Sequence, residues 1–542
     1  MNTQQKLNTQ QEFDTRQQPG MRCRAEPGHG PGMHHDSRLV RRLELDSHAA
    51  PDAFRRRVLL VSALAHAAIL VPLVSALLLA ALAVRFALAA HIAAAAAGFA
   101  LLALLPMAAA LLVLRTLSGR LPVPAGRPLT RDEAPALFDM LDRVRARLDA
   151  PRIDHVLVDD RYNAAIAQRP RFGFLGPFGV LFGQTNYLTL GLPYMLGVPT
   201  KEMTATVAHE VGHLCGDHGK SGAWIGRQRL LFDMLHQHVS GHAAGSLCHR
   251  AAAGVLDRLM PCYHAYTFVL SRQNEYEADR IASSLAGSVA NAQGLVRDTL
   301  QARWIADQFW PTLLRQADHA AQPPFMPFAA MKTAFGAGYA QWAQPQALAA
   351  ALAVRSDVHD THPCLRERVQ AIGERPALPR PVERCAADVL LPAGTLRVLV
   401  REFDEAWWAR AARSWQARHR EAGRERSRLA ELDAQPLAAL SPADLHELAL
   451  LRVGLVAPAA AKDVLACLLA RPGGPFPRAA FHFGCILLAE DDDQGLFQLE
   501  AAVAHDRTLA DGALHAGCAF LERSKGARAA RLWRDSLLPR AA

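Results

Sequence analysis

The chain has 542 residues, of which 51% are hydrophobic and 20% are charged, and its formal net charge is +9. This length exceeds what one compact core usually holds, so we expect roughly two or three structural units. The positive charge does not indicate a nucleic-acid partner, because the sequence has no basic motif with the interleaved aromatic residues of RNA- or DNA-binding modules. The composition fits a globular protein that carries some membrane sequence.

The nine cysteines are scattered along the chain, and no two of them form a C-x-x-C pair. An odd and unpatterned set of this kind indicates reduced thiols in a cytosolic compartment, in contrast to the paired cysteines of a disulfide-stabilised domain. We therefore interpret all nine cysteines as small hydrophobic residues of the core.

The N-terminal part combines a polar tail with two long apolar runs. Residues 1–57 are rich in Gln, Pro, Gly, His and Arg without an apolar period, which predicts a disordered tail. The apolar runs, residues 58–84 and 86–114, are separated by Arg85, and each exceeds the ~20 residues that cross a bilayer. A buried hairpin of a soluble protein is the alternative, but neither run contains a carboxylate. We therefore expect a transmembrane helical hairpin at 58–114.

The arginines around this hairpin predict its orientation. Several arginines precede the first run and several follow the second, whereas Arg85 alone lies at the turn. The positive-inside rule then places both ends of the hairpin on the cytoplasmic side. We expect a multi-pass protein of the bacterial inner membrane whose remaining chain lies in the cytoplasm, with the lipid bilayer as one of its partners.

The elements after the hairpin predict a mainly helical fold with a small sheet. Residues 130–149 have the apolar spacing of an amphipathic helix, and residues 153–158 and 187–190 read as strands. A loop rich in Gly, Pro and Phe spans 169–183 between the two strands. From Pro199 onward the pattern is almost wholly helical, so the predicted fold is mainly α with an α+β core.

The C-terminal part, residues 376–542, contains a weak internal repeat. The segment from Phe481 to Leu488 is echoed from Leu514 to Leu521, at an offset of 33 residues. This offset is close to the ~34 residues of tetratricopeptide helix pairs, although two copies are fewer than a stable solenoid needs. We predict a helical, tetratricopeptide-like domain that could bind protein partners.

The strongest chemical signal is an H-E-x-x-H motif, formed by His209, Glu210 and His213. Residues four apart share one face of a helix, so both histidines can point at one metal ion. Glu210 can reach the coordination position where a catalytic zinc ion holds water, accept a proton there and later pass it to a leaving amine. A chance match occurs in roughly a few per cent of sequences rich in histidine, so the motif requires a second element.

A catalytic zinc site of this type needs a third protein ligand. His218 is excluded as the ligand of an H-E-x-x-H-x-x-G-x-x-H site, because that pattern requires histidine where the chain has Gly219. Glu275 and Asp279 are four residues apart on an apolar helical segment and face the same way. Glu275 can bind zinc, and Asp279 can accept the free N–H of a ligand histidine. The alternative is a solvated helix face, which would be the default without the upstream motif.

Together these motifs resemble the HtpX and CAAX-prenyl-endopeptidase family of membrane gluzincins. The H-E-x-x-H motif is followed by S-R-x-x-E-x-x-A-D at residues 271–279, and residues 361–369 are similar to the family's T-H-P-x-x-x-x-R signature. Residues 186–193 resemble its edge strand. The resemblance covers about 115–375 and implies a gluzincin-like zinc metallopeptidase domain there.

The resemblance also implies a role for each site residue. One zinc ion is expected on His209, His213 and Glu275, with Glu210 as general base and Asp279 supporting the metal ligands. His362, backed by Arg368, is expected to face the substrate and the developing oxyanion. The strand at 187–190 would pair with an extended peptide by β-addition. The chain departs from the family at 219–270, where His, Arg and Gln are too frequent for further membrane spans. This departure puts CAAX processing in doubt.

The sequence therefore favours a membrane-anchored zinc metalloendopeptidase. Its expected substrates are unfolded or membrane-associated proteins at the cytoplasmic face, as in HtpX-like quality control. One alternative is a non-catalytic membrane scaffold with a structural zinc ion, although such a site would not require Glu210. A processing protease with one dedicated substrate is the other alternative.

Overall fold

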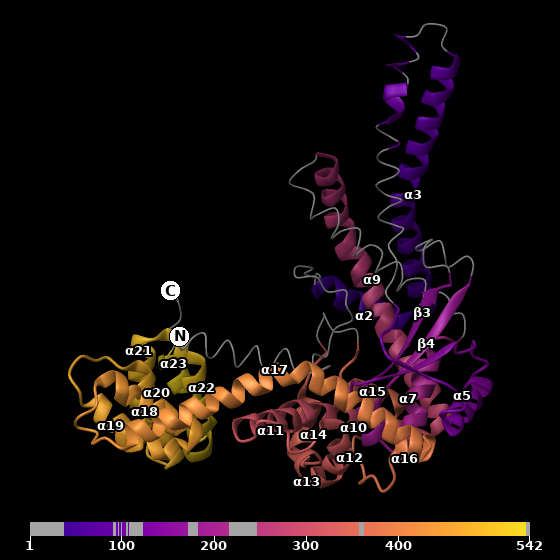
Figure 1. Cartoon of the computed structure of the whole chain (residues 1–542). Coiled ribbons are helices and arrows are strands. Elements are labelled where there is room, and N and C mark those ends of the chain that lie inside the picture. Colours follow the sequence, from indigo (N-terminus) through magenta and orange to yellow (C-terminus); the bar gives the residue numbers. More distant parts are fainter. Residues whose placement is uncertain are drawn as a thin grey trace. The chain divides into compact units, whose positions relative to one another are not determined.

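The computed structural model describes residues 37–89, 94–95, 97–98, 100–104, 107, 123–171, 183–215, 247–356 and 362–537 (Figure 1). The described chain is mainly helical and contains a four-stranded mixed sheet, which confirms the predicted mainly α fold with an α+β core. The chain divides into two compact units, Met1–Leu314 with Phe325–Ala411 and Arg315–Pro324 with Ala412–Ala542. The boundary predicted at residue 375 falls inside the first unit.

The sheet has the strand order β1-β2-β4-β3. β2 and β4 are parallel, whereas β1 pairs with β2 and β3 pairs with β4 in antiparallel fashion. Alternate residues of β4, among them Leu188 and Leu190, are fully buried, which is the pattern of a strand with one face on the core. The strands are β1 (Arg127–Leu129), β2 (His155–Asp159), β3 (Ala164–Pro170) and β4 (Gln184–Gly191).

The predicted β-addition of a peptide to residues 187–190 is wrong. These residues belong to β4, which is paired with β2 on one side and with β3 on the other. Among the described strands, β3 lies at the edge of the sheet beside β4. The sequence did not predict β3, because its short Ala-rich segment lacks the alternation of large apolar and polar residues.

Three helices accompany the sheet in the first unit, one between β1 and β2 and the other two after β4. α5 (Pro135–Leu148) confirms the predicted amphipathic helix, and it packs against α7 through a buried apolar stripe that includes Leu137, Leu141 and Val144. α6 (Leu192–Gly197) is wholly buried between β4 and α7. α7 (Thr200–Gly212) begins after Pro199 and carries the H-E-x-x-H motif.

The long helix α9 (Leu247–Ala286) packs against α7, and α10 (Ser288–Trp304) follows it directly. Gly287 separates α9 and α10 with a φ of 93°, a conformation that glycine adopts without steric cost. α7 and α9 approach closely at Gly212, where an added Cβ would lie 3.4 Å from Ile281 and 3.5 Å from the Cα of Ala278. This approach brings the polar sides of the two helices together.

Buried aromatic rings form the core of the remaining part of the first unit. Trp310 lies 6.3 Å from Trp407 and 6.4 Å from Phe328 between ring centroids, and all three side chains are almost fully buried. The helices of this part are η3 (Ile305–Phe309), α11 (Trp310–Arg315), α12 (Pro327–Ala337), α13 (Tyr339–Trp342), α14 (Pro345–Ala353), α15 (Leu365–Ile372), α16 (Ala386–Leu390) and the start of α17 (Ala393–Asp433).

The prediction of a disordered tail at residues 1–57 is wrong for residues 37–57. The structure has α2 (Ser37–Ala49) and the start of α3 (Pro51–Ala89) there, whereas residues 1–36 lie outside the described residues. Both helices bury apolar side chains against α9, such as Leu43 and Phe54. The partner surface is more than two hundred residues away in sequence, so local composition could not predict this packing.

Within the described part of the chain, no helix combines the length and apolarity that a membrane crossing needs. The first predicted span, 58–84, falls in α3, and the side chains at 66, 68–70 and 72–73 lie outside the described set. Most of the second predicted span, 86–114, lies outside the described residues as well.

The second unit is helical, as the sequence predicts for the C-terminal part. Its two sequence echoes lie on α20 and α22, at Gly484 and Gly517, where the following helix approaches closely. An added Cβ would lie 2.8 Å from Gly495 O in the first case and 2.3 Å from the Trp533 ring in the second. The tetratricopeptide-like assignment stays a prediction.

The helices of the second unit are η4 (Gln316–Asp318), α18 (Pro442–Leu455), η5 (Pro458–Ala461), α19 (Lys462–Leu469), α20 (Pro477–Ala489), α21 (Gln494–His505), η6 (Arg507–Leu509), α22 (Ala510–Ser524) and α23 (Ala527–Leu537).

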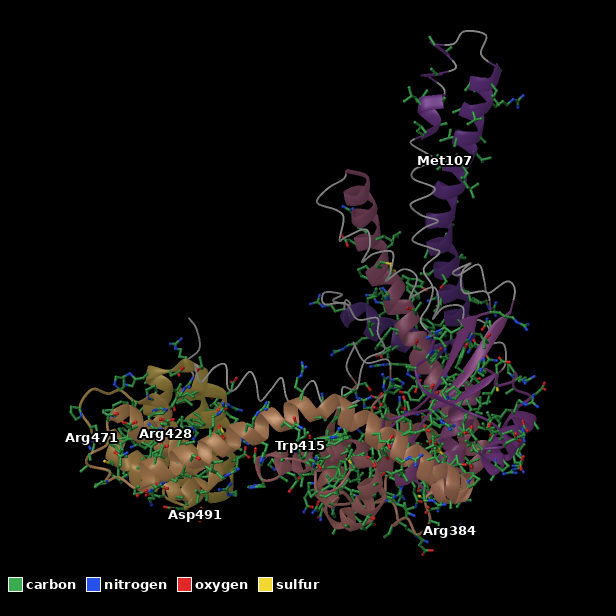
Figure 2. All side chains as sticks on the ribbon, viewed as in Figure 1. Met107, Arg384, Trp415, Arg428, Arg471 and Asp491 are labelled. Carbon is green, nitrogen blue, oxygen red and sulfur yellow. The ribbon has the colours of Figure 1, made fainter. Side chains whose placement is uncertain are left out.

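The later part of α17 belongs to the second unit and is held there by a few polar contacts. The indole N–H of Trp415, a fully buried side chain, donates to the carbonyl oxygen of Ala320 at 2.9 Å (Figure 2). Arg428 donates to Asp444 at 2.8 Å and to Glu447 at 3.1 Å on α18. The Arg428 pairs are partly exposed, so the apolar cluster of α18, α19 and α20 contributes more to the stability of this unit.

We expect Gly191→Ala to destabilise the protein by about 2–4 kcal/mol, because a Cβ at this position would lie 1.7 Å from the carbonyl oxygen of Arg161. Gly191 ends β4, and its N–H donates to Asn163 O at 2.8 Å, so the clash would distort the sheet beside α7. Gly336→Ala on α12 is the control, because nothing lies within 4 Å of its added Cβ. This control should be neutral or stabilising in denaturant unfolding, and equal losses in both variants would contradict the explanation.

Candidate metal centre

Two helices bring the three predicted ligands together. α7 presents His209 and His213 one turn apart, and α9 presents Glu275 opposite them. Ligand atoms of the three side chains all lie within 4.8 Å of one another. The two Nε2 atoms are 3.2 Å apart, and the Glu275 carboxylate lies 3.6 Å from His209 Nε2 and 3.5 Å from His213 Nε2. The structure thus places these residues around one point, as the sequence predicts.

The donor set fits a single zinc ion. Two imidazole nitrogens at 2.0–2.1 Å from a tetrahedral ion are about 3.3 Å apart, which matches the observed separation of 3.2 Å. Glu275 Oε2 is buried and has no hydrogen-bond partner, although a buried carboxylate oxygen normally has one. A cation at this point would satisfy it. Two histidines and one glutamate are also a ligand set of catalytic zinc sites, which keep a fourth position open.

The protonation of these side chains suits ligation. Burial and the neighbouring His209 lower the pKa of His213 to about 4, so its imidazole is neutral near pH 7. Burial opposes ionisation of Glu275, but the adjacent His209 and the nearby positive charges hold the pKa of this carboxyl well below its usual range. Burial also lowers the pKa of His209, yet Asp279 and Glu275 outweigh it and raise this pKa to about 9. A metal ion at His209 would therefore replace a proton.

Asp279 lies behind the ligands and orients one of them. Its side chain is fully buried, and Oδ1 accepts a hydrogen bond from Nδ1 of His209 at 3.0 Å. With the proton on Nδ1, the Nε2 lone pair of His209 points toward His213 and Glu275. The structure places Asp279 in the position that the family resemblance implies.

Arg368 on α15 contacts the same carboxylate. Its Nε donates to Asp279 Oδ2 at 2.8 Å, and a terminal nitrogen donates to Oδ1 at 2.7 Å, which makes a bidentate pair. Arg368 also lies 3.9 Å from Glu275 Oε2. The guanidinium of Arg368 therefore contacts the two carboxylates of α9, and the role of Arg368 in backing His362 stays a prediction. Sequence spacing could not reveal this partner, which lies 89 residues away.

Glu210 sits beside the metal ligands and touches the sheet. Its Oε2 accepts a hydrogen bond from the backbone N–H of Ile166 on β3 at 3.0 Å. Burial raises the pKa of Glu210 above its usual range, which brings a carboxylate closer to the value useful in a general base. Sequence reasoning missed Ile166, because a backbone contact leaves no mark on residue type.

His362 lies at the exposed side of the centre. Its Nε2 is 3.7 Å from Glu275 Oε1, and its side chain is 58% exposed, compared with 9% for Glu275. It precedes α15 and so reaches the ligands from a third segment of the chain. The position suits contact with a substrate, and the role of His362 stays a prediction.

The start of α7 is anchored by a buried ion pair that the sequence analysis did not identify. Arg297 of α10 donates to both oxygens of Glu202 at 2.7 and 3.1 Å, and it also donates to the carbonyl of Arg380 at 2.8 Å. Both side chains are nearly inaccessible to solvent. Loss of one partner would leave an uncompensated buried charge, so this pair strongly constrains the helix that carries the H-E-x-x-H motif.

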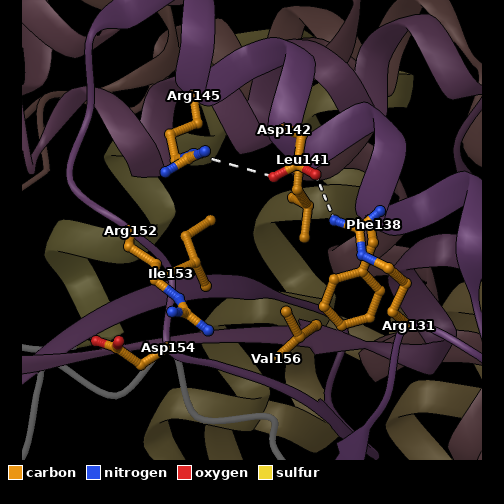
Figure 3. A pocket seen from close by; sticks show the side chains of 9 residues that line it. All are labelled: Arg131, Phe138, Leu141, Asp142, Arg145, Arg152, Ile153, Asp154 and Val156. Atoms are coloured by element: carbon orange, nitrogen blue, oxygen red, sulfur yellow. Dashed lines mark hydrogen bonds and ion pairs between the residues drawn. The ribbon is translucent and has the colours of Figure 1, made fainter.

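A cavity of about 440 Å³ lies between α5 and the start of β2, and none of its lining residues is a predicted metal ligand (Figure 3). Its charged groups largely neutralise one another, since Asp142 pairs with Arg131 and lies 3.9 Å from Arg145. The remaining lining residues are Phe138, Leu141, Arg152, Ile153, Asp154 and Val156.

Comparison with known proteins supports the family expected from the motifs. Residues 180–376 match the model of a family described as peptidase family M48. The match covers the candidate metal centre, confirms the resemblance to HtpX-like and CAAX-type metallopeptidases, and confirms that the chain is a metallopeptidase. No curated protein and no solved structure gives a significant match to the chain.

We expect Arg368→Ala to weaken zinc binding roughly 10- to 100-fold, because it leaves the buried Asp279 without its cation and frees His209 to reorient. Competition with a chromophoric zinc chelator would measure this change. Arg366→Ala on the same helix is the matched control, since the half-buried Arg366 donates to the carbonyl oxygen of Val354 and is not bonded to Asp279. Normal zinc affinity together with a low kcat in Arg368→Ala would favour the earlier expectation of a role through His362.

Proposed function

We propose that this chain, whose residues 180–376 carry a metallopeptidase of family M48, is a zinc-dependent endopeptidase. The observation that carries the proposal is the convergence of His209, His213 and Glu275 with Glu210 at their side. A structural zinc site usually has four protein ligands and needs no general base. The described site supplies three ligands and the half-buried carboxylate of Glu210, which favours catalysis over a scaffold role.

The residues suit peptide hydrolysis. A bound zinc ion would lower the pKa of water and polarise the scissile carbonyl. Glu210 then accepts the proton of the attacking water and delivers it to the leaving amine, a task that its raised pKa supports. His362, exposed beside Glu275, donates a hydrogen bond to the oxyanion that develops on the substrate carbonyl.

The edge strand supports an extended peptide as the substrate. β3 has β4 on one side, and its other side faces α7, where the N–H of Ile166 meets Glu210. A peptide that adds to this edge of β3 would take the place of the contact between Ile166 and Glu210 and pass directly beside the general base. Such addition needs a chain without its own secondary structure, so we propose unfolded or membrane-associated proteins as substrates.

The exposed apolar side chains of α3 support membrane anchoring. Leu64, Val71, Leu78 and Leu88 are 61%, 61%, 65% and 84% exposed, so one helix exposes several large apolar side chains. Contiguous apolar surface of this kind marks contact with a bilayer or another protein. With the arginines that flank the apolar runs, this favours a bacterial inner-membrane protein with a cytoplasmic catalytic domain.

These features together suggest HtpX-like quality control at the cytoplasmic face of the membrane. The helical second unit would then bind protein partners or present substrates. A processing protease for one dedicated substrate remains the alternative, and a defined sequence preference among many cleaved proteins would favour it. Trapping substrates in cells with a Glu210→Gln variant would distinguish the two.

Glu210→Gln should keep zinc but lower the hydrolysis of unfolded casein by roughly 10²–10⁴-fold, because only the proton acceptor is removed. Glu275→Ala should lose both zinc and activity, because it removes a ligand. Zinc content and cleavage rate would be measured on the same preparations. Wild-type cleavage by Glu210→Gln would contradict the proposed mechanism.

His362→Ala should lower kcat by roughly 10²–10³-fold with unchanged zinc content, as loss of one oxyanion donor does. The reason is that the hydrogen bond from His362 strengthens in the transition state while contributing little to metal binding. His155→Ala, which changes an exposed histidine of β2, is the control and should leave kcat unchanged. An unchanged kcat/KM in His362→Ala would show that His362 is a surface residue without a role in catalysis.

A further inference from the structure

The N-terminal helices contact α9 immediately before the metal ligand Glu275. Arg272, three residues before Glu275, forms an ion pair with Glu44 of α2. The side-chain amide of the next residue, Gln273, donates to the carbonyl oxygen of Ser47 at 3.0 Å. The two contacts tie α2 to the turn of α9 that leads into Glu275.

A third contact lies on the other side of the ligand. Arg55 of α3 is 3.8 Å from Glu277, two residues after Glu275. This pair is partly exposed and weak by itself, whereas the side chain of Arg272 is only 10% exposed. The Glu44–Arg272 pair is therefore the stronger of the two ion pairs between the N-terminal helices and α9.

An apolar layer lies beside these polar contacts. Phe54 stacks on Tyr266 at 5.9 Å between ring centroids, and the guanidinium of Arg272 lies 4.6 Å from the ring centroid of Phe268. This packing holds the stretch of α9 before Arg272 against the N-terminal helices. The buried residues of the layer are Val40, Leu43, Phe54, Val58, Ala265, Phe268, Val269 and Leu270.

Glu275 lies between two differently supported stretches of the same helix. On its C-terminal side, Ala278 and Ile281 pack against Gly212 of α7, the helix that carries the histidines. On its N-terminal side, α9 is held by α2 and α3 and not by α7 alone. The position of the Glu275 carboxylate therefore depends on both contacts.

We propose that α2 and the first turns of α3 act as a strap that positions Glu275 for metal binding, with Glu44 and Arg272 as positioning residues. Undocking of the strap lets α9 shift or fray before Glu275, and the third ligand then leaves the two histidines. Because α3 continues directly from the strap, whatever engages its apolar surface is coupled to the metal centre. This inference rests on the proposed zinc site.

The test uses the full chain and the substitution Glu44→Ala, which removes the acidic partner of the buried Arg272 without touching the metal ligands. We expect about a tenfold loss of zinc affinity by chelator competition, in the range found for residues that support metal ligands. We also expect faster hydrogen exchange of residues 270–278 in the metal-free protein, with unchanged exchange in α7. The charge-swapped double variant Glu44→Arg with Arg272→Glu should restore part of both properties.

Asp46→Ala is the matched control, because Asp46 also lies on α2 but pairs with Arg57 at 3.0 Å and not with α9. An equal loss in Asp46→Ala, or zinc affinity within about twofold of wild type in Glu44→Ala, would overturn the strap. Glu275→Ala separates this failure from a failure of the proposed function. If Glu275→Ala binds zinc normally, the assignment of the metal centre itself is wrong. If Glu275→Ala loses zinc while Glu44→Ala keeps wild-type zinc affinity, only the strap is rejected.

Discussion

Asp279 lies on α9, and its buried carboxylate accepts hydrogen bonds from His209 of α7 and from Arg368 of α15. A buried carboxylate without such partners would be strongly destabilising, so the three helices are constrained to meet around it. Because Asp279 fixes the tautomer of His209, the same contact that joins the helices also prepares the ligand. Stability and metal binding therefore depend on one interaction at the centre of this unit.

The neighbours of the other two ligands also suit them to a metal ion. His213 is held neutral and Glu275 is held ionised by their neighbours, which are the forms that bind a cation. The helix that carries His213 is anchored at its start by the Glu202–Arg297 pair and along its length by α9. These contacts fix the position of α7 beside α9.

The contact between Ile166 and Glu210 connects the sheet with the same centre. A backbone N–H at the edge of a sheet is a binding position for an extended chain, and here it meets the expected general base. The proposed substrate-binding edge and the proposed general base are thus neighbours in space. The open side of the centre, where His362 lies, completes this arrangement.

Local spacing alone determined that His209 and His213 share one helix face and that Glu275 and Asp279 share another, because helical periodicity depends only on neighbouring residues. It predicted Glu210 as the base beside them. Three other features were decided by the tertiary structure: the partner of Arg368, the edge position of β3, and the docking of α2 and α3 on α9. Each joins segments far apart in sequence, and the burial that stabilises such contacts exists only after the chain has folded.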